Sequence, residues 1–156
     1  MAIGLLTLLS TTCCCGLNTP AGAAEAARGD LARLQGTWTA RAGRGKDIQV
    51  VLKIEADAVD VAIAAPGGLQ FSVKGNLKVD DATTPKALDW TGLTLFDGQE
   101  FPDNLAIDAL EGDTFTLRNG GPNNARPREF APGQGALAGV VIFSREQPLA
   151  RTARAK

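Results

Sequence analysis

Histidine and tyrosine are both absent from this chain of 156 residues. Histidine is the usual general base at neutral pH and the commonest metal ligand, so its absence removes every Ser-His and Cys-His nucleophile arrangement. Catalysis would have to rest on carboxylates, lysine, serine or threonine. We therefore expect a protein that is not an enzyme, that uses no cofactor and that holds no metal ion.

Cysteine is confined to three consecutive positions, Cys13 to Cys15. An apolar stretch from Ala2 to Ser10 precedes them, and the small residues of Ala21-Gly22-Ala23 suit cleavage by a signal peptidase. We expect residues 1–23 to be a signal peptide, so that the protein is exported to the periplasm or secreted without disulfides. A lipid anchor is the less favoured alternative, because Thr12 precedes the first cysteine.

The chain has neither a surplus of one charge nor a long hydrophobic run. Its 16 basic side chains against 17 acidic ones leave a net charge of -1, so no overall field favours nucleic acid. No segment approaches the roughly 20 apolar residues of a membrane-spanning helix. We expect no nucleic-acid partner and no transmembrane span, and a single domain with one sizeable core.

What the chain does contain is a repeated alternation of apolar and polar residues, the pattern of half-buried strands. In Leu69 to Asp80, the clearest case, the alternation continues for a strand of roughly 40 Å, so we expect a bend at Gly75. A helical turn capped by Asp30 is expected before the first strand. The expected strands begin at Gly36 and continue at 48–54, 59–63, 69–80, 87–91, 92–96, 104–110, 114–118 and 137–145.

Eight or nine short strands with turns between them predict an all-β fold, an up-and-down antiparallel barrel closed on itself. The first strand carries Trp38 and the last carries Arg145. These two side chains meet only if the sheet closes, with the guanidinium over the indole in a cation-π contact of roughly 1 kcal/mol. We expect a lead and helical turn over 24–35, the barrel over 36–146, and a disordered basic tail over 147–156.

Four short motifs occur in a fixed order before a final strand that ends in Arg145. Together they resemble the lipocalin-like family of small exported domains found chiefly in planctomycetes. The resemblance implies an up-and-down barrel of the lipocalin type and no established activity. The chain departs from the family at Asn104–Asp108, where a Gly-Ile-Tyr-like strand is expected. The motifs are Leu34–Trp38, Thr84–Asp89, Glu111–Phe115 and Arg126–Phe130.

The leading hypothesis is a non-enzymatic barrel that binds a small apolar ligand or acts as an interaction module for a protein partner. Gly36, Trp38 and Arg145 would form its structural signature, although Trp38 as a pocket wall is an alternative. Inward-facing side chains would contact the ligand, with Trp90 near the mouth. These residues are Leu52, Ile54, Val61, Ile63, Phe71, Val73, Trp90 and Phe143.

Two further groups of residues have a chemical interpretation beside a structural one. Arg126 and Arg128 are candidate anion contacts, but one of them would equally pair with Asp89 or Glu129 and tie a long loop to the barrel. Close acidic pairs offer acid-base or calcium chemistry, although each falls at an expected turn. A carboxylate-based hydrolase or lyase and a structural envelope protein are therefore the alternatives. The acidic pairs are Asp80-Asp81, Asp97 with Glu100, and Glu111 with Asp113.

Overall fold

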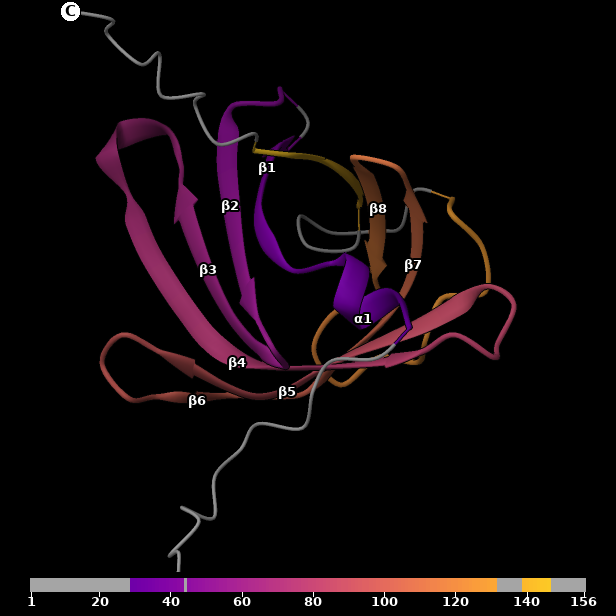
Figure 1. Cartoon of the computed structure of the whole chain (residues 1–156). Helices are drawn as coiled ribbons and strands as arrows, with labels where there is room; N and C mark the ends of the chain where they lie inside the picture. The colour runs from indigo at the N-terminus through magenta and orange to yellow at the C-terminus, as the bar shows by residue number, and fades with distance from the viewer. Residues whose placement is uncertain (1–28, 44, 132–138, 147–156) are drawn as a thin grey trace, which may run out of the picture.

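The computed structural model describes residues 29–43, 45–131 and 139–146, which form a closed antiparallel barrel of eight strands (Figure 1). Each strand pairs with the next along the barrel, and the last returns to the first, as the sequence predicts. The predicted signal peptide, the basic tail and the start of the predicted final strand lie outside the described residues. The barrel strands are β1 (Gly36–Ala42), β2 (Ile48–Glu55), β3 (Ala58–Ala64), β4 (Gln70–Asp80), β5 (Lys86–Leu95), β7 (Asn104–Glu111), β8 (Thr114–Asn119) and β9 (Val140–Arg145).

Three short elements complete the described chain. Helix α1 (Asp30–Arg33) precedes β1, and the turn η1 (Pro66–Gly68) joins β3 to β4. Strand β6 (Glu100–Phe101) pairs with β5 outside the ring of eight, and this hairpin projects at the lower left of Figure 1. Within the described residues, no helix is long and apolar enough to cross a bilayer.

The prediction of two separate strands at 87–91 and 92–96 is wrong, because these residues form the single strand β5. Its register against β4 shifts between Lys74 and Asn76, so that Gly75 faces both Gly92 and Leu93. Gly92 lies in the left-handed region (φ 58°), which accommodates the extra residue of the bulge. A β-carbon on Gly75 would lie 2.8 Å from the carbonyl oxygen of Thr91, so glycine is required where the two strands approach.

The core consists of the apolar side chains that the alternation turns inward. Its centre is aromatic: the ring of Phe115 lies 5.7 Å from that of Trp38 and 5.7 Å from that of Phe143, centroid to centroid. Trp38 and Leu34 are completely buried. At about 25 cal/mol per Å² of apolar surface, this burial is the main stabilising contribution to the barrel.

The two ends of the barrel differ. At one end, called here the closed end, lie α1 and the β2–β3, β4–β5 and β7–β8 turns; the β1–β2, β3–β4 and β5–β6 connections lie at the open end. The prediction that Asp30 caps the helix is wrong. Gly29 occupies the cap position, and Asp30 is the first helical residue, with its side chain buried in other contacts.

Candidate functional site

The seam between β1 and β9 joins the two ends of the chain. Trp38 faces Arg145 in the register, and the guanidinium carbon lies 4.1 Å from the indole centroid, which confirms the predicted cation-π contact. Arg145 also donates hydrogen bonds of 2.5 Å to the carbonyl oxygens of Gln35 and Arg33. Gly36 (φ 107°) lies beside this guanidinium. The indole is fully buried, and its Nε1 donates to the carbonyl of Leu34.

The eight side chains predicted to contact a ligand divide into two groups. Leu52, Ile54, Val61, Trp90 and Phe143 are buried in the core. Ile63 and Val73 are partly buried against the core, and Phe71 is half-buried near the open end. The buried five therefore pack against one another, and only Ile63 and Phe71 also line the hollow described next.

A hollow of about 510 Å³ lies on β2, β3 and β4 near the open end. Two rows of cross-strand neighbours line it, Val51–Ala62–Ser72 and Gln49–Ala64–Gln70. These positions alternate with the buried ones, so the hollow lies on the outer face of the sheet. We call it the outer groove.

Phe96 borders the outer groove and is 75% exposed. It follows directly after β5, and its ring is the most exposed of the large apolar side chains in the described residues. The small side chains of Ala62 and Ala64 leave space beside it, while Gln49 and Gln70 offer hydrogen bonds. The outer groove is thus mainly apolar with a few polar groups, the composition typical of small-molecule sites.

The two arginines predicted as anion contacts lie on the loop after β8. Arg126 forms an ion pair with Asp89 at 2.6 Å and donates to the carbonyl of Ala106 at 2.6 Å. This is the alternative in which an arginine ties the loop to the barrel wall. Arg128 is exposed. Arg118 also holds the loop, since it donates to the carbonyl of Glu129.

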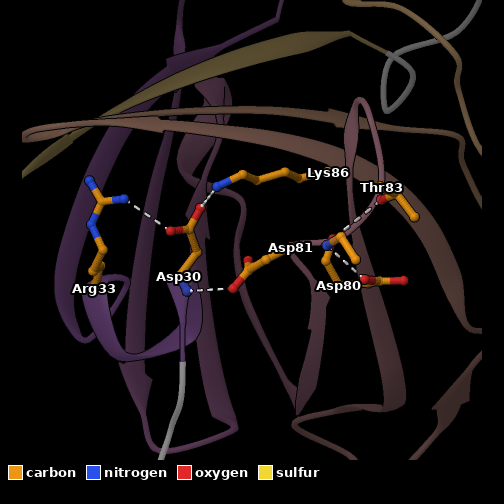
Figure 2. A network of polar contacts seen from close by, with 7 residues as sticks. Asp30, Arg33, Asp80, Asp81, Thr83 and Lys86 are labelled. Carbon is orange, nitrogen blue, oxygen red and sulfur yellow. Dashed lines mark hydrogen bonds and ion pairs between the residues drawn. The ribbon is translucent and has the colours of Figure 1, made fainter.

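A polar network lies at the closed end, around Asp30 (Figure 2). Lys86 and Arg33 both donate to its carboxylate, and Asp81 accepts the Asp30 amide at 2.9 Å. Burial alone would raise the pKa of Asp30, but the hydrogen bonds and charges of Lys86 and Arg33 outweigh burial and lower it. The hydrogen bond to Asp30 raises the pKa of Lys86. The network fastens α1 to β5.

Asp108 lies next to this network and was missed by the sequence predictions. It pairs with Lys86 in the register of β5 and β7, is 1% exposed, and neither carboxylate oxygen has a hydrogen-bond partner. Burial, and to a smaller extent the charge of Asp30, raises the pKa of Asp108 to about 6. A signal exists in the sequence: Asp108 interrupts the inward-facing row of Ala106 and Leu110.

Of the acidic residues predicted at turns, Asp80, Asp97 and Asp113 make polar contacts there, whereas Glu100 lies in β6 and Glu111 in β7. Asp80 accepts the amide of Ala82, and Asp97 accepts the amide of Gln99. Asp113 pairs with Arg145 at 3.0 Å. Within 29–43, 45–131 and 139–146, no group of three or more Cys, Asp or Glu side chains is arranged to hold a metal ion.

Comparisons with protein-family models, with curated proteins and with solved structures return no match.

Proposed function

We propose that this protein is an exported, non-enzymatic binding barrel of the lipocalin-like type, whose ligand is a small and mainly apolar molecule held in the outer groove. The observation that carries the proposal is the groove of about 510 Å³ beside the exposed ring of Phe96. Small-molecule sites have volumes of about 300 to 1,000 Å³. Contiguous exposed apolar surface marks ligand-binding grooves, and Phe96 continues the apolar lining of this one.

The ligand would lie across three strands. Its apolar part would contact Phe96, Val51 and Ala62, and polar atoms would reach the amides of Gln49 or Gln70. The groove holds no charged side chain among its lining residues, so a neutral ligand avoids the cost of stripping water from an ion without a partner.

The carboxylate-based hydrolase finds less support. Two carboxyl groups free to act as acid and base are needed for that chemistry. Near Asp108, the carboxylate of Asp30 is bound by two cations, and Asp81 already accepts a backbone amide. Only Asp108 combines a raised pKa with an unpartnered carboxyl group among the described residues.

The test is a fluorescence titration with the neutral apolar dye N-phenyl-1-naphthylamine. The unmodified protein should bind it saturably, and Phe96→Ala should weaken the affinity by about tenfold because it removes one wall of the groove. Ile142→Ala is the matched control, since Ile142 is 59% exposed but lies on β9, outside the groove. Equal affinity in the two variants, or no saturable binding, would contradict the proposal and favour the interaction-module alternative.

A further inference from the structure

A second hollow, of about 490 Å³, lies at the closed end between the β4–β5 turn, β7 and the loop after β8. Its lining includes Thr84, Lys86, Asp108, Glu111 and Phe130. We call it the closed-end hollow. It shares no lining residue with the outer groove, so it is an independent site.

Asp108 is the most buried of the residues that line this hollow. A buried polar group without a partner costs roughly 1 to 3 kcal/mol, and more when the group is charged. Such unpartnered groups are rare in protein interiors, and each calls for an explanation such as a functional role or a bound water or ion. A carboxyl group with both oxygens unpartnered beside a hollow is therefore suited to receive a hydrogen-bond donor from a ligand.

The charges around Asp108 decide what kind of donor fits. Helix α1 contributes Asp30 and Arg33, the β4–β5 turn contributes Asp81, β5 contributes Lys86 and β7 contributes Glu111. Both cations are already paired with Asp30. The acidic groups that line the hollow outnumber its basic groups, so its potential favours a positive charge.

We propose that the closed-end hollow binds a small organic cation, a primary alkylammonium, with the carboxylate of Asp108 as its counter-ion. A compact ammonium group at the end of an alkyl chain is narrow enough to approach oxygens that are almost closed to solvent. The ring of Phe130, 37% exposed on the wall, supplies an apolar surface and a cation-π partner.

A metal ion fits this hollow less well than an ammonium group. Metal sites need several ligand atoms arranged around one point, and the described residues hold no such group of acidic side chains here. An ammonium group needs one carboxylate and a few hydrogen-bond acceptors. Asp108 offers the carboxylate, and the hydroxyl groups of Thr83 and Thr84, which also line the hollow, are acceptors.

The experiment is a calorimetric titration of the whole chain with 2-phenylethylamine at pH 7.5, where this amine is charged. We expect saturable binding, at least tenfold weaker in Asp108→Asn and unchanged in Glu100→Gln. The control removes the same charge from an exposed residue of β6 at the open end. The neutral analogue 2-phenylethanol should bind at least tenfold more weakly than the amine.

Affinity should also increase as the pH rises through about 6, because protonated Asp108 offers no negative charge. Absence of saturable binding, equal affinity in Asp108→Asn, or equal affinity for the alcohol would each overturn the proposal. Because the Phe96→Ala and Asp108→Asn variants alter different hollows, failure here leaves the proposal for the outer groove untouched.

Discussion

The two ends of the barrel differ in how deeply their apolar side chains are buried and in the polar contacts that hold them. At the closed end lie the fully buried Trp38 and Leu34 and the helix α1, which accepts charged hydrogen bonds from Arg145 at the Arg33 carbonyl and from Lys86 at the Asp30 carboxylate. At the open end, Ile63 and Phe71 are only partly buried, and Phe96 stands in solvent. We therefore expect the closed end to contribute more to stability than the open end, which presents an apolar surface to solvent.

The largest expected effect is at the closed end. Trp38→Ala should lower the free energy of unfolding by about 3 to 5 kcal/mol, because it opens a cavity against Phe115 and removes the platform of Arg145. Phe71→Ala at the open end should cost about half as much, since that side chain is only half-buried. Urea unfolding followed by circular dichroism measures both. Equal losses would remove the distinction between the ends.

Asp108 is the exception at the closed end, where it destabilises the fold. Its pKa rises from an ordinary 3.8 to about 6 on folding, so the folded protein holds the proton more tightly than the unfolded chain does. The contribution of Asp108 to stability is then fully present below about pH 4 and is lost as the pH rises to about 6. At about 1.4 kcal/mol per pH unit, the loss is on the order of 3 kcal/mol.

Asp108→Asn should therefore be more stable than the unmodified protein at pH 8, by up to about 3 kcal/mol, with the advantage shrinking towards pH 4. Urea midpoints measured across this pH range test the expectation. A difference between the two proteins that stays constant with pH would show that Asp108 has an ordinary pKa.

The contact between β4 and β5 predicts a smaller effect. Gly75→Ala should cost about 1 to 3 kcal/mol, because the new methyl group would lie 2.8 Å from both the Thr91 carbonyl and the Leu93 side chain. Gly139→Ala is the control, since a β-carbon there meets nothing within 4 Å and its φ is not in the left-handed region. If Gly75→Ala lowered the free energy of unfolding no more than Gly139→Ala does, the two strands would be able to move apart around the methyl group without cost.

The smallest effect is expected at the rim of the open end. Phe96→Ala should change the free energy of unfolding by less than about 0.5 kcal/mol, as is usual for exposed positions, while it weakens dye binding. A loss above about 1 kcal/mol in the same urea assay would make Phe96 part of the core and blur the contrast between the ends.

Most of the barrel could be predicted from the sequence, because the alternation of apolar and polar residues that marks a strand is visible within each short segment. The closure of the barrel was predicted from Trp38 and Arg145, because a tryptophan in the first strand and an arginine in the last can form a cation-π contact when those strands pair. The break expected before Gly92 was wrong because a glycine that starts a strand and one that sits in a bulge look alike along the chain.

The candidate sites depend on neighbours that are distant in sequence, and these were harder to predict. The outer groove arises where small residues of β3 lie between larger ones of β2 and β4, which requires the register of three strands. The environment of Asp108 requires both its pairing with Lys86 and the position of α1. From the sequence, only the inward orientation of Asp108 could be predicted, from its place in the alternation along the strand.

The bonds of Arg145 span almost the whole barrel sequence, since its partner Gln35 lies 110 positions earlier. Such long-range pairing is slow to form, and during synthesis it has to wait for the final strand to emerge. A chain that stops short of β9 would leave β1 and β8 as unpaired edges, and exposed edges invite pairing with other chains. Loss of only the last strand should thus yield an aggregation-prone protein instead of a slightly smaller barrel.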